Sequence, residues 1–218
     1  MIITIDGPAG VGKSTIAKLL AKALNFDFLN TGAMYRCAAL AALQAGISIE
    51  DHDRLVEHVK DLKFEQKGER IFLDGLDVTE RIRAADITKL VSSVANVIPL
   101  RLILIQWQRD FARDRNIVTE GRDQGTVVFT DAQCKIFLTA SPEIRARRRT
   151  DQLLAQGVTA DFQQILEEQV QRDLQDSQRS FGALKQSPDS EVVISDHMSP
   201  DDVLEALLTL VRAKTLPH

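Results

Sequence analysis

Short apolar runs recur along the chain, and stretches with helical periodicity separate them. The apolar runs are residues 2–5, 26–29, 116–120, 134–139 and 191–195. Runs of this kind are typical of strands buried on both faces of a parallel sheet. The main helical patterns between them cover residues 31–45, 99–114, 142–156, 161–181 and 200–213. Strands that alternate with helices predict an α/β fold with a doubly wound parallel sheet of about five strands.

One region interrupts this alternation. Residues 63–79 alternate polar and apolar side chains around Gly68 and Gly75, a pattern that predicts a small antiparallel hairpin or meander. We therefore expect residues 60–85 to form an insert on the α/β core, within a single domain that spans residues 1–218.

The sequence GPAGVGKST follows the first strand and fits the spacing G-x-x-x-x-G-K-[ST]. Glycines let the backbone curl tightly, so that its N–H groups point inward and form a nest for phosphate oxygens. The helix that follows adds the positive end of its dipole. In this geometry Lys13 reaches the β- and γ-phosphates, and the Ser14 hydroxyl ligates Mg²⁺. The residues expected to bind the nucleotide are Gly7, Pro8, Ala9, Gly10, Val11, Gly12, Lys13, Ser14 and Thr15.

The context of this loop separates it from an ordinary glycine-rich turn. A short apolar strand precedes it, and a helical stripe follows it, formed by Ile16, Leu19, Leu20 and Ala23. Strand, glycine loop and helix in this order predict a site for a nucleoside triphosphate with Mg²⁺.

Composition and charge argue against several classes of protein. A net charge of −4 disfavours a general nucleic-acid binder, which normally carries a basic excess. No apolar run reaches the length of a membrane span, and a chain that enters a strand at once leaves no room for a signal peptide. Cys37 and Cys134 lack the spacing of metal ligands and are expected to be reduced, buried hydrophobes. These features favour the cytoplasm.

A phosphate loop alone does not separate a kinase from a GTPase switch, a motor or a transporter ATPase. The N-K-x-D motif of GTPases is absent, so a second binding site is needed to decide. Arg36 follows the second strand, and Arg122 and Asp123 follow the third. Both positions lie at the carboxyl edge of the predicted sheet, where α/β proteins bind ligands. Each residue alone could equally be a capping or solvated group.

The predicted helix 161–181 carries a polar stripe of Arg172, Asp176 and Arg179 on one face. The apolar residues on the opposite face are Leu166, Val170, Leu174 and Phe181. We expect the apolar face to pack inward, which leaves the stripe as either solvated ion pairs or a binding surface. The same choice applies to the arginine-rich run RARRR at residues 145–149, because kinases use mobile arginines to neutralise the transferring phosphoryl group.

Several motifs occur in one order along nearly the whole chain: GPAGVGKST, TGAMYR, LDGLDVTERIR, SSVANVIPLR, EGRDQGTVVFTDA, RARRR and RDLQDSQR. In this combination the chain resembles the bacterial cytidylate kinases. GRDxGTVVF together with TGAMYR is what best distinguishes it from adenylate and shikimate kinases.

The resemblance implies that the γ-phosphoryl group of ATP is transferred to CMP or dCMP, with Mg²⁺ bound to the ATP. It also implies three parts: a core, an insert at residues 60–85 that binds the nucleoside monophosphate, and an arginine-bearing lid at residues 145–160. The core comprises residues 1–60, 86–145 and 161–218.

Site residues follow from the resemblance position by position. Arg36, Arg122 and Arg179 would hold the CMP phosphate, and Arg172 and Asp176 would hold the sugar hydroxyls. Three further residues would recognise the cytosine: Ser92, Arg101 and Asp123. An acid suits the amino group of cytosine, and an arginine suits its acceptors. The groups expected to act on the transferring phosphoryl group are Lys13, Arg36, Arg122, Arg179 and, from the lid, Arg148, although any of Arg145, Arg147, Arg148 and Arg149 could serve.

Two departures from the family pattern affect the lid and a loop. Thr150 stands where an aromatic residue often follows the lid arginines, and Gly182-Ala183-Leu184 replaces a common Ser-Pro-Leu. Neither position is an expected ligand contact. Two alternatives stay open: a kinase for UMP or another small acceptor, and a nucleotide-dependent switch without phosphoryl transfer. By resemblance the protein is expected to be a monomer, and its charge and apolar pattern predict that it contacts neither nucleic acid nor membrane.

Overall fold

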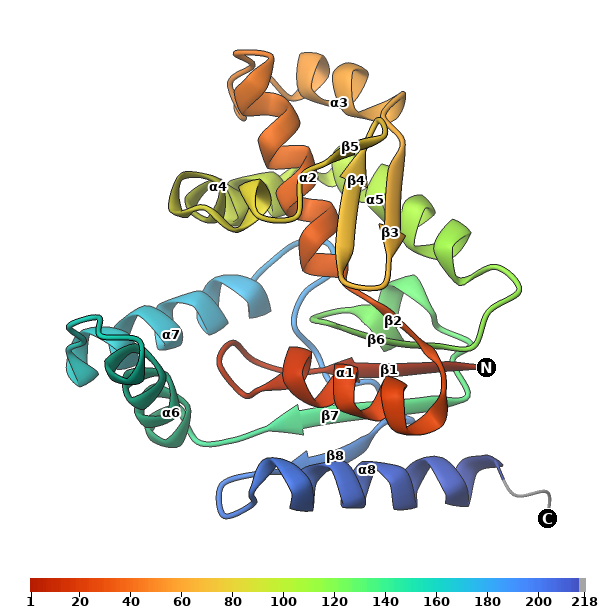
Figure 1. The fold of residues 1–218 in the computed structure, drawn as a ribbon, viewed down its shortest axis with the longest axis vertical. Helices are drawn as coiled ribbons and strands as arrows, with labels where there is room; N and C mark the ends of the chain where they lie inside the picture. Colours follow the sequence, from red (N-terminus) through yellow and green to blue (C-terminus); the bar gives the residue numbers. More distant parts are fainter. Residues whose placement is uncertain (216–218) are drawn as a thin grey trace. The chain divides into compact units, whose positions relative to one another are not determined.

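The computed structural model of the chain describes residues 1–215 and has an α/β fold (Figure 1). Its main sheet has five strands in the order β2-β6-β1-β7-β8. Strand β1 pairs in parallel with β6 and β7, and β7 pairs in parallel with β8. The strands are β1 (Ile2–Asp6), β2 (Asp27–Leu29), β6 (Ile117–Gly121), β7 (Cys134–Thr139) and β8 (Glu191–Ile194). The predicted parallel sheet is thus confirmed, with each strand within a residue or two of its expected position.

The chain divides into two compact units. The first, here called the phosphate-loop unit, joins Met1–Phe28 to the chain from Asn116 onward. The second, here called the inserted unit, is Leu29–Arg115. Strand β2 crosses the boundary between them.

The core of the phosphate-loop unit lies on one face of the sheet. Alternate residues of β1, Ile3 and Ile5, are fully buried there, because side chains of a strand point to opposite faces in turn. Helices α1 (Lys13–Leu24) and α8 (Pro200–Thr215) supply the covering layer. Their buried side chains, including Leu20 and Leu207, belong to the same apolar cluster as the strand residues. This packing fixes the end of β1 against the start of α1, which is where the phosphate loop lies.

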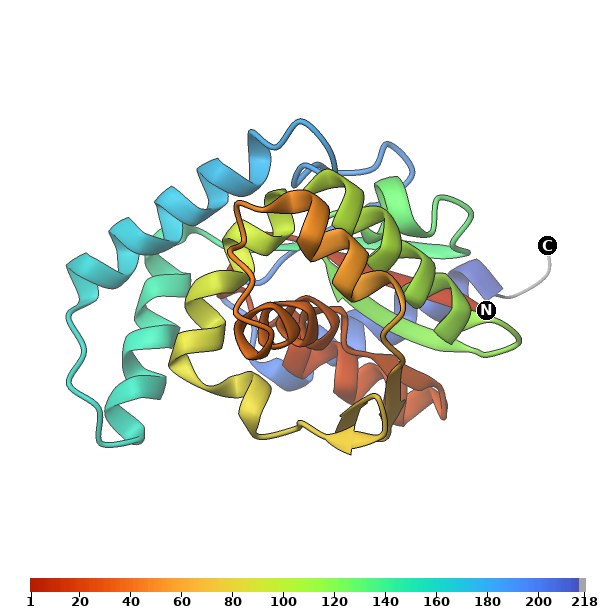
Figure 2. The ribbon, with the colours of Figure 1, turned by 90° about the horizontal axis from the view of Figure 1, so that it is seen from above.

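Helices α6 (Pro142–Ala155) and α7 (Phe162–Ser177) form a second part of the phosphate-loop unit. They are joined by the short loop at residues 156–161 and run back from it at an angle to each other (Figures 1 and 2). The Asp161 side chain caps α7 by accepting a hydrogen bond from the Gln164 N–H at 2.7 Å, which satisfies one of the donors left open at a helix start.

The inserted unit contains the predicted antiparallel meander. Its three strands lie in the order β3-β4-β5. The turns use Gly68 and Gly75, whose φ angles of 61° and 78° fall in the left-handed region that glycine tolerates best. The ring of Phe64 stacks on Trp107, with centroids 5.8 Å apart. The elements of this unit are α2 (Thr31–Gln44), α3 (His52–Lys60), β3 (Phe64–Lys67), β4 (Arg70–Leu73), β5 (Leu76–Asp77), η1 (Arg81–Arg83), α4 (Ala85–Asn96) and α5 (Ile98–Ala112).

Two helices of the inserted unit, α3 and α4, were not predicted. Helix α3 buries only Leu55 and Val59, so its apolar stripe is too short to stand out in the sequence. Within residues 1–215, no single helix is long and apolar enough to cross a membrane. Helices α4 and α5 satisfy that test only as a pair, and they meet at an angle of 102°.

Candidate active site

The phosphate loop joins β1 to α1, and its glycines are required by geometry. A Cβ atom at Gly7 would lie 2.0 Å from the carbonyl oxygen of Leu138, so the backbones of two strands approach too closely for any side chain. Gly12 caps α1 with a φ of 95°, a conformation that other residues adopt only with strain. The loop therefore presents its backbone at the N-terminus of α1, which is a ready-made anion site.

Lys13 is buried and turned onto its own loop. Its ammonium group donates hydrogen bonds to the carbonyl oxygens of Gly7 at 2.8 Å and Pro8 at 2.6 Å. Burial, and to a smaller extent the charge of Arg122, lower its pKa from 10.5 to about 7, although the charges of Glu120 and Asp6 oppose this shift. A buried cation held next to carbonyl groups is prepared to exchange them for phosphate oxygens, which would restore its ordinary pKa.

This lowered pKa makes the stability of the protein depend on pH. Between about pH 7 and pH 10.5 the unfolded chain binds more protons at Lys13 than the folded chain does, so stability rises with pH. Raising the pH from 7 to 9 is therefore expected to stabilise the wild type by about 2 kcal/mol relative to Lys13→Met. Urea unfolding of both proteins at the two pH values measures the difference. An equal difference at both values would contradict the burial of this charge.

Asp6, the last residue of β1, ties the phosphate loop to the segment after β6. Its two carboxylate oxygens accept the backbone N–H groups of Gln124 and Gly125, each at 2.8 Å. Burial nevertheless raises its pKa from 3.8 to about 6, with a smaller contribution from the charge of Asp123. Asp123 itself is buried. The loop and Asp123 are therefore held to one another through a single carboxylate.

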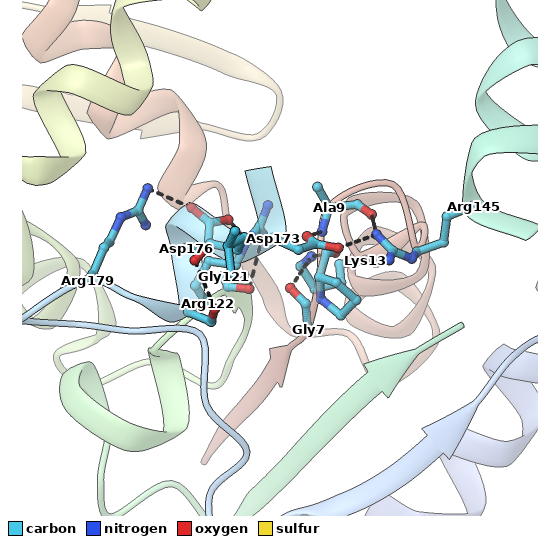
Figure 3. A network of polar contacts seen from close by, with 12 residues as sticks. Gly7, Ala9, Lys13, Gly121, Arg122, Arg145, Asp173, Asp176 and Arg179 are labelled. Atoms are coloured by element: carbon cyan, nitrogen blue, oxygen red, sulfur yellow. Dashed lines mark hydrogen bonds and ion pairs between the residues drawn. The ribbon is translucent and has the colours of Figure 1, made fainter. Parts of the chain in front are cut away.

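Two arginines converge on Asp176, as Figure 3 shows. The Arg122 Nε donates to one carboxylate oxygen at 2.7 Å, and an Arg179 nitrogen lies 2.6 Å from the other. The Asp176 side chain is only 4% exposed, and both arginine side chains are less than one-fifth exposed. This arginine cluster carries a net charge of +1 in the same unit as the phosphate loop. It is well suited to an anion, because arginine forks match phosphate oxygens.

The helix predicted at residues 161–181 differs from the structure in its length and in the face that it buries. The helix ends at Ser177, so Arg179 lies beyond it. The apolar side chains Val170 and Leu174 are 42% and 46% exposed, whereas Gln169 and Asp176 are buried. The inner face of α7 contacts polar groups of the phosphate loop and of α6. The sequence pattern of a single helix does not reveal such partners.

The arginines of the run 145–149 each have a partner within the phosphate-loop unit. Arg145 is buried and bonds to Ala140, Ala9 and Asp173. Arg148 donates to the carbonyl oxygens of Ser195 at 2.5 Å and Met198 at 3.3 Å. The other two arginines contact neighbours on or near α6: Arg147 lies over the ring of Phe162, and Arg149 bonds to Gln152.

Arg36, Ser92 and Arg101 belong to the inserted unit. Arg36 lies on α2 and Ser92 on α4, both half-buried. Arg101 on α5 is buried, donates to the Ala95 carbonyl oxygen at 3.1 Å, and lies over the ring of Tyr35 at 5.6 Å. Packing thus fixes Arg101 in one orientation within its unit.

The residues fit a magnesium ion that is bound mainly through a nucleotide. Among residues 1–215, no group of three or more His, Cys, Asp or Glu side chains is arranged to hold a metal ion. Mg²⁺ commonly keeps several waters and binds through substrate phosphates with one or two protein oxygens. The exposed Ser14 at the start of α1 supplies one such oxygen. Glu120 and Asp6, which act electrostatically on Lys13, supply carboxylates in the same region.

Sequence reasoning missed Asp6, Glu120, Asp173 and the buried position of Arg145. Asp6 and Glu120 could have been predicted from the sequence. Each is an acidic residue at the end of a predicted strand, directly before a motif that was assigned to the site. Asp173 and Arg145 gave no such signal, since their importance comes from contacts with each other and with Ala9.

The fold and the loop define a P-loop nucleotide-binding protein of the α/β class. The structure is similar to TT1252 from Thermus thermophilus, with a TM-score of 0.52 and 18% identity over 100% of this chain and 98% of that one. It is also similar to a shikimate kinase from Bacteroides thetaiotaomicron, with a TM-score of 0.50 and 11% identity over 97% and 98% of the chains. These likenesses concern the fold alone.

Sequence comparison is more specific. The family model for cytidylate kinase matches residues 3–213. A cytidylate kinase of Rhodopirellula baltica is 50% identical over 97% of this chain and 93% of its own. One from Caldanaerobacter subterraneus is 44% identical over 98% and 95%. The chain therefore belongs to the cytidylate kinase family, as its motifs predicted.

Proposed function

We propose that this protein transfers the γ-phosphoryl group of ATP to the phosphate of CMP or dCMP, which yields ADP and CDP or dCDP. The observation that carries the proposal is the arginine cluster on Asp176, in one unit with a phosphate loop and in a chain of the cytidylate kinase family. One site binds the donor phosphates, and the other neutralises an acceptor that is itself an anion.

On the donor side, the loop N–H groups and the N-terminus of α1 receive the ATP phosphates. Lys13 leaves the carbonyl groups of Gly7 and Pro8 and bonds to the β- and γ-phosphates. The Ser14 hydroxyl would hold Mg²⁺, and Glu120 and Asp6 would supply carboxylates in the same region. When bound, the metal would supply positive charge that offsets the negative charge of the phosphates.

On the acceptor side, Arg36, Arg122 and Arg179 hold the CMP phosphate. Arg172 and Asp176 hold the sugar hydroxyls. Asp176 can serve the sugar while it binds two arginines, because an ionised carboxylate offers about four acceptor sites. The residues that recognise the cytosine are Ser92, Arg101 and Asp123.

Little covalent chemistry is required of the chain. A CMP phosphate oxygen attacks the γ-phosphorus, the bond to the ADP oxygen breaks, and no protein nucleophile takes part. The protein aligns the two phosphates and neutralises their charge. The lid arginines contribute on closure, which also excludes water. For Arg148 this requires its guanidinium group to leave the carbonyls of Ser195 and Met198, to which it bonds.

A panel of acceptors tests the proposal against its rivals. ATP turnover is measured with CMP, dCMP, UMP, AMP or GMP and with no acceptor. We expect rapid ADP formation with CMP and dCMP only. A kinase for another nucleotide would give a different preferred acceptor. A nucleotide-dependent switch would turn ATP over slowly, at the same rate with every acceptor.

The acceptor role of Arg179 gives a second test. Arg179→Ala should lower kcat/KM for CMP by about 10²-fold, since a positioned charge at the phosphate is lost, and should leave the dissociation constant of ATP nearly unchanged. The cost in stability should be only about 1–3 kcal/mol, because Asp176 keeps its bond to Arg122.

Arg113→Ala is the matched control. Arg113 also forms an i,i+3 pair with an aspartate, Asp110, but its side chain is 71% exposed. This variant should change neither stability nor activity appreciably. If Arg179→Ala weakened ATP and CMP binding equally, the acceptor role would be wrong.

A further inference from the structure

Helix α7 carries a polar stripe of low exposure on the side that contacts the phosphate loop. Gln169, Asp173 and Asp176 are spaced four and three residues apart, so they share one face of the helix. Gln169 covers Gly10: a Cβ atom there would lie 2.6 Å from its side-chain nitrogen. Asp173 accepts the backbone N–H of Ala9 at 2.9 Å. Two successive residues of the loop therefore lie against α7, and one of them, Ala9, is hydrogen-bonded to it.

Arg145 of helix α6 also bonds to Ala9. Arg145 donates to the Ala9 carbonyl oxygen at 2.7 Å and to the second carboxylate oxygen of Asp173 at 2.6 Å. Its Nε also donates to the Ala140 carbonyl oxygen at 3.0 Å. Both backbone polar groups of Ala9 are thus bonded to an ion pair whose side chains are 4% and 18% exposed. Figure 3 shows the bonds that join Asp173, Ala9 and Arg145 to one another.

We infer that Asp173 is a positioning residue for phosphoryl transfer and that Arg145 makes its negative charge compatible with bound ATP. This rests on the proposed function. Asp173 fixes the loop at Ala9, so that the neighbouring N–H groups stay directed at the donor phosphates. Hydrogen bonds to an ionised group are about twice as strong as neutral ones, which suits a contact that must hold a loop of glycines.

The charge balance makes this role distinct from a purely structural one. A carboxylate beside a phosphate site repels the phosphates unless a cation neutralises it. Arg145 is that cation, and it contacts the same loop residue. Its removal should therefore harm ATP binding more than the removal of Asp173 does, because an unpaired negative charge is left at the loop.

The same helix continues to Asp176, which holds Arg122 and Arg179. Asp173 bonds to Ala9 and Arg145, whereas Asp176 bonds to Arg122 and Arg179, so the two ends of the stripe can be tested separately. Changes at Asp173 should affect the donor nucleotide and leave the acceptor arginines in place.

The test compares Asp173→Asn, Arg145→Met and the double variant, with Glu167→Gln as control. Glu167 is an exposed residue of the same helix. Dissociation constants for MgATP alone and for CMP alone are measured by calorimetry, together with thermal stability and steady-state kinetics. Asp173→Asn keeps an oxygen for the Ala9 N–H but loses the ion pair, so the ATP constant should rise about fivefold.

The ATP dissociation constant of Arg145→Met should be about ten times that of Asp173→Asn. The double variant should return to the level of Asp173→Asn, since it no longer contains the unpaired charge. The CMP constant should stay within about twofold throughout, and Glu167→Gln should match the wild type. The loss on Arg145→Met should also diminish at high salt, because screening weakens the repulsion.

Equal loss of ATP and CMP binding, or additive effects in the double variant, would overturn the inference. If Arg145→Met does not fold, Arg145→Lys keeps the charge without the fork. It should then bind ATP no worse than Asp173→Asn, and weaker binding would also overturn the inference. Because these binding measurements use no acceptor reaction, they stand even if the wild type fails to phosphorylate CMP, a failure that would reject the proposed function instead.

Discussion

Replacement of Lys13 by methionine is expected to lower kcat for CMP phosphorylation by about 10³-fold or more, while the protein stays folded. In the proposed mechanism the lysine supplies the cation nearest to the charge that develops on the transferring phosphoryl group, and such preorganised charges are among the largest contributions to catalysis. Methionine fills a similar volume without a charge. The protein should therefore keep its packing and lose the interaction with phosphate.

Steady-state kinetics with saturating ATP and CMP measure this loss, and thermal unfolding confirms that the variant is folded. Lys22→Met is the matched control, because Lys22 is an exposed residue of the same helix, α1. It should retain wild-type kinetics. A folded Lys13→Met protein with near-normal turnover would show that the loop is not the donor site.

Asp123→Ala is expected to abolish most CMP activity and to narrow the preference for CMP over UMP. Uracil presents an oxygen where cytosine presents its amino group, so a carboxylate attracts one base and repels the other. A site built on hydrogen bonds can reject the wrong analogue by ~10⁴-fold, whereas shape alone gives ~10²-fold. Without Asp123, both the attraction and the repulsion disappear, and the ratio should fall toward the lower value.

The measurement is kcat/KM for CMP and UMP in both proteins. Asp131→Ala serves as the control, because Asp131 is an exposed acid close in sequence. The stability of Asp123→Ala needs checking as well, since Asp123 contributes to the raised pKa of Asp6. If both acceptors slow equally and the ratio holds, Asp123 acts in orientation or folding, and another residue distinguishes the bases.

Much of the fold could be predicted because its signals are local. A parallel strand such as Ile2–Asp6 is apolar by necessity, since it is covered on both faces. The glycines of the phosphate loop are equally constrained: the position of Gly7 against the Leu138 carbonyl excludes a side chain. The meander was predictable because its turns require left-handed residues at Gly68 and Gly75.

What could not be predicted depends on partners distant in the sequence. The apolar side chains of α7 suggested that Val170 and Leu174 face inward, yet they are exposed. The inner face carries the polar residues Gln169 and Asp173, and the half-buried carboxylate of Asp173 is satisfied by Ala9 and Arg145. The periodicity of apolar residues predicts the buried face of a helix only where that face is apolar. The prediction fails for a helix such as α7, which packs through polar contacts.

The burial of Lys13 was likewise not predictable from the sequence. A lysine in a glycine loop is expected to be exposed, but it is only 5% exposed. Its pKa near 7 is the consequence, and no sequence pattern contains the burial that causes it. The residues of the loop were thus predictable, whereas their electrostatic state was not.

A competition experiment tests the central claim most directly. ATP labelled in its γ-phosphoryl group is mixed with equal concentrations of CMP and UMP and a small amount of the protein, and the products are separated at early times. The account predicts that the label enters CDP, with little in UDP or in inorganic phosphate. Label that accumulates mainly in UDP would contradict the base preference, and label released only as inorganic phosphate would contradict transfer to a nucleotide altogether.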